Sequence, residues 1–220
     1  MKIHTRATTA TVGGLALLTL SSCGAAYYKA MEAFGYAKRD LLIERVEDGR
    51  KQQTEAKEQI QETYKAFQEL TGGGGSELET VYKKLAKQLG RSKDEAAQVR
   101  RSIERIEKVG TDLFAEWETE IQEIHSTDLR AKSTALRRDT LARYQKMVSA
   151  MHTAEGRMAP VLQTFQDQVT FLKHNLNAQV ISGLETTVGE IGKTVDNLIA
   201  EMESSIREAN SFIKSMDGKS

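Results

Sequence analysis

The sequence predicts an all-α fold: an elongated antiparallel helical bundle with coiled-coil seams, formed by three long legs, or by four or five helices if its glycine-rich break reverses the chain. Three observations lead to this prediction. Pro160 is the only proline among 220 residues, and strong helix formers (Ala, Glu, Lys, Gln, Leu, Arg) dominate the composition. Apolar residues recur at seven-residue spacings, and no segment sustains the alternation of β-branched residues that is typical of a strand.

The first element is an export signal. Lys2 and Arg6 precede an apolar run at residues 10–20, which is shorter than the ~20 residues that a membrane-spanning helix needs. Leu20-Ser21-Ser22-Cys23 then looks like the bacterial lipobox, in which the cysteine thiol receives a diacylglycerol. We therefore predict a lipoprotein signal peptide at residues 1–22 and a lipid on Cys23. The alternative is an ordinary signal peptide, in which this cysteine has no special role.

Cys23 is the only cysteine, so it cannot form a disulfide within the chain. Two or three acyl chains hold a protein stably on a membrane, whereas one does so only marginally. Gly24 is not the aspartate that retains lipoproteins in the inner membrane of enteric bacteria. We expect the mature protein to be anchored in the cell envelope, with the outer membrane facing the periplasm favoured over the inner membrane.

The mature chain, residues 23–220, is expected to form a single helical coiled-coil domain. Removal of Lys2 and Arg6 with the signal leaves 29 basic and 31 acidic residues. This balance gives no overall attraction to nucleic acid or to an anionic bilayer. The expected partners are therefore the membrane, through the lipid, and a protein partner or a second copy, through the helices.

The first helical block is expected at about residues 26–70. A glycine-rich break follows at residues 71–76, which is either a hinge or a hairpin, since four consecutive glycines are too costly to hold in a helix. The second half of the block keeps a coiled-coil seam with small and polar members. Its positions are Val46, Gly49, Gln53, Ala56, Ile60, Thr63, Phe67 and Leu70.

Two further blocks are expected before the last leg. Gly90 is predicted to end a short helix at residues 77–89, and Ser92 with Glu95 forms a capping box that restarts the helix. The third block is expected to continue to about residue 155, and the cap-forming stretch at residues 125–128 is a candidate interruption.

Gly156 and Pro160 are predicted to mark the final reversal of the chain. The last block then reaches about residue 216, with a heptad row from Leu184 to Met216 in which Ser205 is the polar member. Three legs of near-equal length would each span roughly 90 Å.

Motifs for chemistry are missing from the sequence. A helix rather than a strand is expected before Gly72–Gly75, and no lysine follows the glycines as it would in a phosphate-binding loop. His125, His152 and His174 have no other metal-binding residue at ligand spacing. We therefore expect no catalytic site, metal or cofactor, and we expect that the protein is not an enzyme.

One segment carries a local excess of positive charge. It could bind an anionic envelope component such as peptidoglycan, lipopolysaccharide or lipid headgroups. The alternative is a solvated face whose cations pair with acidic residues on a neighbouring leg. The candidate residues are Arg130, Lys132, Arg137, Arg138, Arg143 and Lys146.

His174, Asn175 and Asn177 lie in a stretch expected to be helical, where they lower the helix propensity. We expect them to form a polar layer that fixes the register between helices, as a buried asparagine does in coiled coils. A functional patch is the alternative.

Several segments together resemble a bacterial lipoprotein family catalogued as domain of unknown function 2959 (DUF2959). The resemblance covers nearly the whole mature chain and implies a helical, coiled-coil-rich periplasmic protein without an assigned activity. The segments are Tyr27-Tyr28, Gly35–Asp40, Glu44-Arg45-Val46, Leu78–Tyr82, Leu113–Glu118, Met158–Leu162 and Leu172–Ala178.

The sequence thus favours a structural or interaction protein, held at the membrane by Cys23, that presents its helical bundle to an envelope partner or to itself. The alternative function is a binding module for an anionic envelope component through the basic segment at residues 130–146.

Overall fold

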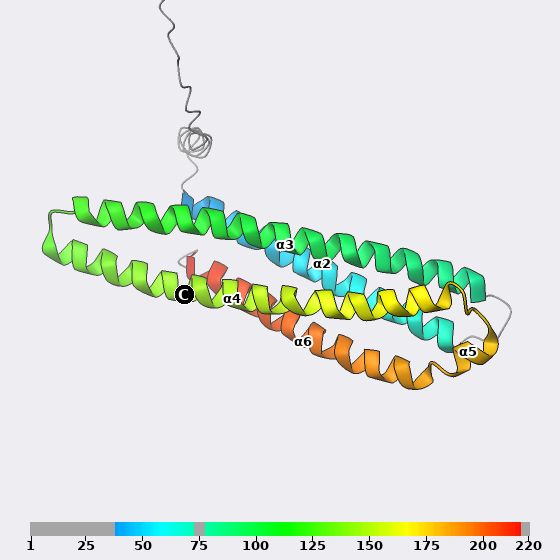
Figure 1. Ribbon diagram of the computed structural model, residues 1–220. Helices are drawn as coiled ribbons and strands as arrows, with labels where there is room; N and C mark the ends of the chain where they lie inside the picture. Colours follow the sequence, from blue (N-terminus) through cyan, green and yellow to red (C-terminus); the bar gives the residue numbers. More distant parts are fainter. Residues whose placement is uncertain (1–37, 73–77, 217–220) are drawn as a thin grey trace, which may run out of the picture. The chain divides into compact units, whose positions relative to one another are not determined.

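The computed structural model describes residues 38–72 and 78–216, and every secondary-structure element in these ranges is helical (Figure 1). The predicted signal peptide, Cys23 and the predicted break at residues 73–76 lie outside the described residues. The helices are α2 (Lys38–Gly72), α3 (Leu78–Glu123), α4 (Thr127–Leu172), α5 (Ala178–Ser182) and α6 (Glu185–Met216). None of them combines the length and the apolarity that a membrane crossing requires.

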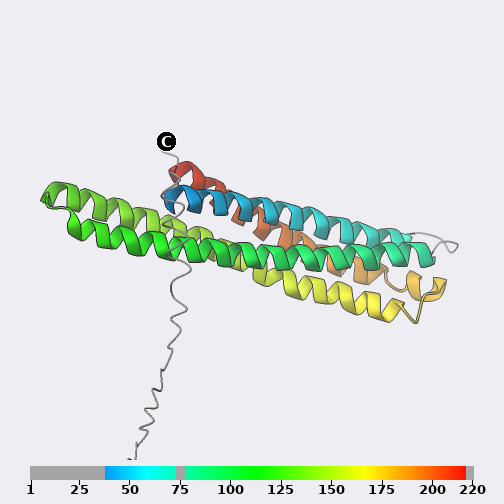
Figure 2. The same cartoon turned by 90° about the horizontal axis from the view of Figure 1, so that it is seen from above.

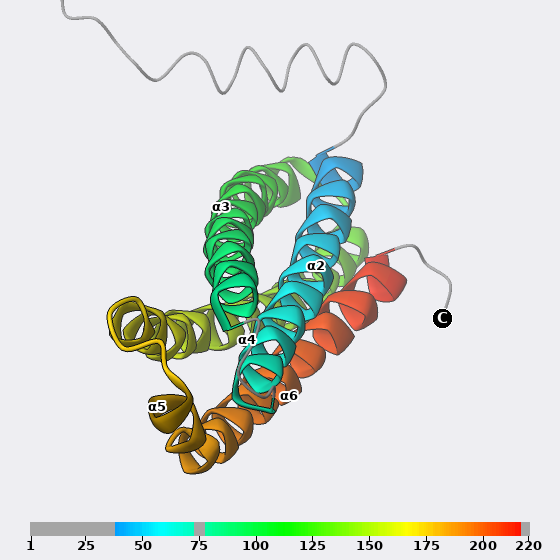
Figure 3. The same ribbon diagram turned by 90° about the vertical axis from the view of Figure 1, so that its right-hand side faces the viewer.

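The four long helices form an up-down-up-down bundle. In the ring that they form, α2 packs on α3, α3 on α4, α4 on α6, and α6 closes back on α2 (Figures 1 and 3). Residue numbers rise on one helix as they fall on its neighbour. Between α2 and α6, Arg50 contacts Asn210 and Lys57 contacts Glu203, and between α2 and α3 the ion pairs are Lys38 with Glu116 and Glu69 with Lys84. The prediction of an all-α antiparallel bundle is therefore confirmed.

The core consists of the heptad rows. All eight predicted seam positions of α2 are buried, from Val46 to Leu70, and so is Ser205 with most of its row on α6. The largest fully buried side chains include Phe67, Phe165 and Phe212. Helices of 32–46 residues cannot bury such rows alone, so packing between the helices supplies most of their stability.

The predicted break at Gly90 and Ser92 is wrong, because α3 runs without interruption from Leu78 to Glu123. The hydroxyl of Ser92 is fully buried, where it lies 2.8 Å from the Thr63 hydroxyl and donates to the carbonyl of Gln59. Ser92 therefore bonds across the α2–α3 pair instead of capping a new helix. Gly90 is exposed, and one such glycine costs a helix only about 1 kcal/mol.

The predicted reversal at Gly156 and Pro160 is also wrong, because both residues lie inside α4. A proline ring crowds the carbonyl of the residue four positions earlier, which here is Gly156. Both residues face solvent, so the bundle absorbs the lost hydrogen bond on its outer surface. The chain turns instead at residues 124–126, where the Ser126 side chain caps α4 by accepting from the Leu129 N–H.

Because the chain turns at other places than predicted, the number of long helices also differs from the three predicted legs. The candidate interruption at residues 125–128 is a true reversal, and α2 and α3 are antiparallel, so the chain also reverses between them. The bundle thus has four long helices, as the hairpin alternative predicts, and its 46-residue helices span ~69 Å rather than roughly 90 Å.

Two glycines receive tyrosine side chains from neighbouring helices. The ring and hydroxyl of Tyr144 on α4 lie against Gly110 on α3, where a Cβ atom would overlap them. The hydroxyl of Tyr64 on α2 lies in the same way against Gly192 on α6 and donates to the carbonyl of Val188. Each pair allows close approach at only one relative position of its two helices.

Replacing Gly110 by alanine is therefore expected to destabilise the bundle by about 1–3 kcal/mol, because the buried Tyr144 ring must move. The matched control is Gly90→Ala in the same helix, where nothing lies within 4 Å of the new Cβ. That variant is expected to gain about 0.5–1 kcal/mol from helix propensity. Urea unfolding followed by circular dichroism measures both, and equal effects of the two substitutions would contradict the packing argument.

Candidate functional site

The best-formed surface feature lies at the end of the bundle where the described parts of α2 and α6 stop. At that end α3 and α4 continue past the other two helices and meet at their connection (Figures 1 and 2). The ion pair of Lys38 with Glu116 marks the level at which α2 begins, and α3 extends seven residues farther, to Glu123. We call residues 117–137 the α3–α4 tip.

The tip leaves large apolar side chains exposed. Leu129 and Leu136 expose 57% and 58% of their surfaces, although leucine is usually among the buried residue types. Their spacing of seven residues places them in one row of α4. Farther along α4 the same row contains the exposed Arg143 and the half-buried Ala150, so it flanks the buried face of the helix. On the tip, this flanking row carries two exposed leucines.

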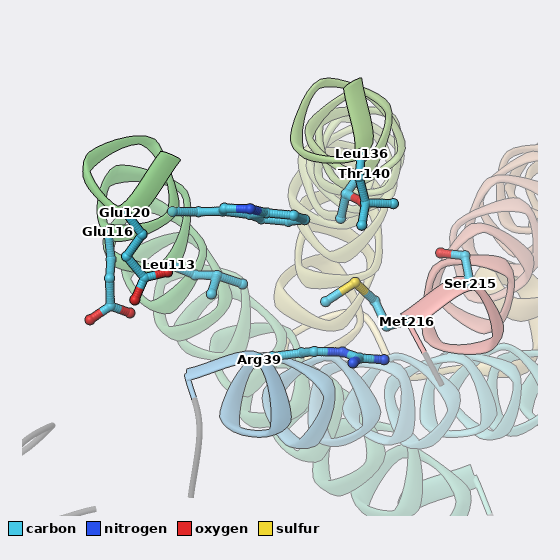
Figure 4. A pocket seen from close by; sticks show the side chains of 9 residues that line it. Arg39, Leu113, Glu116, Glu120, Leu136, Thr140, Ser215 and Met216 are labelled. Carbon is cyan, nitrogen blue, oxygen red and sulfur yellow. The ribbon is translucent and has the colours of Figure 1, made fainter. Parts of the chain in front are cut away.

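A cavity of about 420 Å³ lies at the base of the α3–α4 tip (Figure 4). Leu113, Leu136 and Met216 converge on it from α3, α4 and α6, whereas the carboxylates of Glu116 and Glu120 lie at its outer edge. The mostly apolar wall with a few charged groups at the edge is typical of a site that accepts an apolar group. The full lining is Arg39, Leu113, Glu116, Trp117, Glu120, Leu136, Thr140, Ser215 and Met216.

Trp117 is held rigidly in the wall of the cavity. Its indole N–H donates to the hydroxyl of Ser133 across the helix pair at 3.0 Å. Its ring stacks on Phe114, with centroids 6.3 Å apart and 12° between the planes. Phe114 contacts Tyr144, which in turn contacts Phe212, so an aromatic row leads from the cavity into the core.

Tyr144 is the one buried titratable group in this aromatic row. Burial raises the pKa of its phenol to about 12, and the nearby carboxylate of Glu107 acts in the same direction. The hydroxyl donates to the carbonyl of Ile106 at 3.3 Å. Tyr144 is therefore neutral at physiological pH and serves to pack α4 against α3.

The predicted basic segment lies along α4, and most of its cations have partners. Arg137 pairs with Glu118 and donates to the carbonyl of Phe114, and Lys146 pairs with Glu208 on α6. Arg137 and Lys146 thus pair with acidic residues on neighbouring helices, as the alternative expects for the whole segment. The remaining members of the segment are Arg130, which donates to the Ile124 carbonyl, Lys132 on Asp128, Arg138 on Asp139, and the exposed Arg143.

The predicted polar register layer at His174, Asn175 and Asn177 is corrected by the structure. These residues lie in the connection between α4 and α5, and His174 and Asn177 are exposed. Asn175 donates to the Phe171 carbonyl, while the side-chain oxygen of Asn177 accepts from the Val180 N–H as the cap of α5. Asparagine forms such local bonds at helix ends, so Asn175 and Asn177 lie at helix boundaries here rather than in the core.

The described residues contain no cluster of three or more potential metal ligands. His152 has a single acidic partner, Glu107, at 2.8 Å, and both side chains are substantially exposed.

Sequence analysis missed Leu129 and Leu136, because their segment was interpreted by its charges. Their seven-residue spacing is the signal that could have drawn attention to them.

Comparison with known proteins places the chain in a family. A family model described as Protein of unknown function (DUF2959) matches residues 27–216, which confirms the resemblance found in the sequence. Neither the curated proteins nor the solved structures contain a match. The description assigns no activity, so the function must be argued from the molecule itself.

The raised pKa of Tyr144 makes stability depend on pH above neutrality. The unfolded chain releases the phenolic proton near pH 10, whereas the folded protein retains it to about pH 12. Stability from this group is therefore complete below pH 10 and falls as the pH rises to 12. Tyr144→Phe is expected to lose less stability than the wild type between pH 10 and 12, as measured by urea unfolding. Identical pH profiles for the two proteins would contradict this assignment.

Proposed function

This chain belongs to the family described as Protein of unknown function (DUF2959), and we propose that it is an interaction protein of the cell envelope. A lipid on Cys23 tethers it to a membrane, and its bundle presents the α3–α4 tip to a protein partner. The observation that carries this proposal is the uncovered apolar row of Leu129 and Leu136 beside the cavity lined by Trp117.

The chemistry of the tip favours a protein partner. Anchor residues that dominate protein interfaces are large side chains inserted into well-formed pockets, and the cavity offers such a pocket with a rigid wall. Its edge carries both signs of charge, Arg39 on α2 and Glu120 on α3. A polar rim around an apolar centre is the usual anatomy of such interfaces.

The membrane tether rests on the sequence, because Cys23 lies outside the described residues. The signal-like segment before it and its place as the only cysteine both favour lipidation. Anchoring near the N-terminus would hold the bundle close to the membrane surface. The proposed location is the periplasmic face of the outer membrane.

Cys23→Ser tests the tether, because serine cannot form the thioether to diacylglycerol. The variant is expected to move from the membrane fraction of cells to the soluble fraction, with an unchanged circular dichroism spectrum. Fractionation with a high-salt wash measures the change. A Cys23→Ser protein that still sediments with the outer membrane would show that the lipid is not the anchor.

The role of the tip can be tested by placing a photo-crosslinking amino acid at Leu136 in intact cells. A discrete adduct with a protein is expected on irradiation, because this side chain lies at the proposed interface. The matched control is Phe171, which exposes 48% of its surface near the opposite end of α4. Equal adducts from both positions, or none from Leu136, would argue against the tip as the interaction surface.

A further inference from the structure

The middle of the core contains a glutamine that has no hydrogen-bond partner among the described residues. Gln53 on α2 is fully buried, and neither its amide oxygen nor its amide nitrogen is paired. The hydroxyl of Ser205 on α6 is buried and unpaired in the same way. Buried polar groups are nearly always satisfied, because leaving them unpaired costs the full loss of their hydration.

Gln53 and Ser205 lie at one level of the bundle. Two contacts between α2 and α6 bracket them: Arg50 donates to Asn210 at 2.8 Å, and Lys57 pairs with Glu203 at 3.3 Å. Gln53 lies between the two α2 residues on the buried face, and Ser205 lies between the two α6 residues. The core residues near this level include the small Gly49, Ala56, Ser102 and Ala209, together with the larger Ile106 and Met202.

A second polar level shows that this bundle can pair its buried hydroxyls directly. The hydroxyls of Thr63 and Ser92 lie 2.8 Å apart, and both lie within hydrogen-bonding distance of the Gln59 carbonyl, so one can donate to the other and the second to the carbonyl. The level of Gln53 differs, since its long side-chain amide is buried without a direct hydrogen bond among the described residues. A buried water typically makes about three hydrogen bonds to groups of this kind.

We propose that Gln53 and Ser205 form a hydrated register layer. Water molecules bind between the amide of Gln53 and the hydroxyl of Ser205, and the layer fixes which residues of α2 and α6 face each other. It is the counterpart of a buried asparagine in a coiled coil, which selects one pairing at a cost in stability.

The alternatives that the layer excludes follow from the heptad row of α6. A shift of α6 by one heptad would bring Leu198 or Phe212 to the level of Gln53 in place of Ser205. Either side chain would replace the hydroxyl and leave the amide against an apolar surface. The native register is the one in which the amide meets a hydroxyl.

Cysteine pairs measure the register directly in a Cys23→Ser, Tyr64→Ala background, which also removes the contact of Tyr64 with Gly192 that fixes α2 against α6. Arg50→Cys with Asn210→Cys reports the native pairing, and Arg50→Cys with Glu203→Cys reports a shift by one heptad. With Gln53 present, a short bismaleimide is expected to link only the first pair. With Gln53→Leu, both pairs are expected to form. Selective linking of the native pair in Gln53→Leu, and in the less bulky change Gln53→Met, would overturn the proposal.

The water bridge predicts that Gln53 and Ser205 act as one unit. The unfolding equilibrium constants of Gln53→Leu, Ser205→Ala and the double variant should depart from multiplicative behaviour by about fivefold or more. Thr63→Val combined with Ser205→Ala is the control and should be multiplicative, because Thr63 belongs to the other level. Multiplicative behaviour within twofold for the Gln53 pair would overturn the bridge.

Discussion

The structure depends on the register in which four long amphipathic helices pack. None of α2, α3, α4 and α6 can bury its apolar row alone, so each helix relies on two neighbours in the ring. The pattern of apolar residues in a coiled coil repeats every seven residues. Two helices could therefore slide by one repeat along each other and still bury similar apolar side chains, so apolar contacts alone determine the register weakly. The departures from the repeat remove this ambiguity: Tyr144 against Gly110, Tyr64 against Gly192, and the polar level of Gln53.

The same register creates the proposed interaction surface. The described parts of α2 and α6 stop at the level of Lys38 and Met216, and beyond this level α4 exposes Leu129 and Leu136, which flank its buried face. The cavity beside Trp117 arises at this transition from four helices to two. The surface therefore combines this cavity with large apolar side chains at positions that are charged farther along α4, such as Arg143 and Arg157.

The sequence predicted the heptad rows well and the helix ends poorly. The α2 seam from Val46 to Leu70 is buried as expected, since periodicity reports which face of a helix is covered. Gly90 and Pro160 were interpreted as breaks, yet packing along α3 and α4 outweighs these local signals. Asn177 is the opposite case, because a core position was expected and its side chain instead caps the start of α5 in the connection after α4. The exposure of Leu136 depends on where α6 stops, which no local pattern reports.

Amide hydrogen exchange along α4 tests the central claim, which is that one register covers most of this helix and leaves the α3–α4 tip open. Buried positions such as Met151 and Phe165 lie in the four-helix region, whereas residues 127–137 lie in the tip. The account predicts that amides of the tip exchange about 100-fold faster or more than those at residues 144–165, because local opening there breaks fewer contacts. Uniform protection from Thr127 to Phe165 in the isolated protein would contradict it.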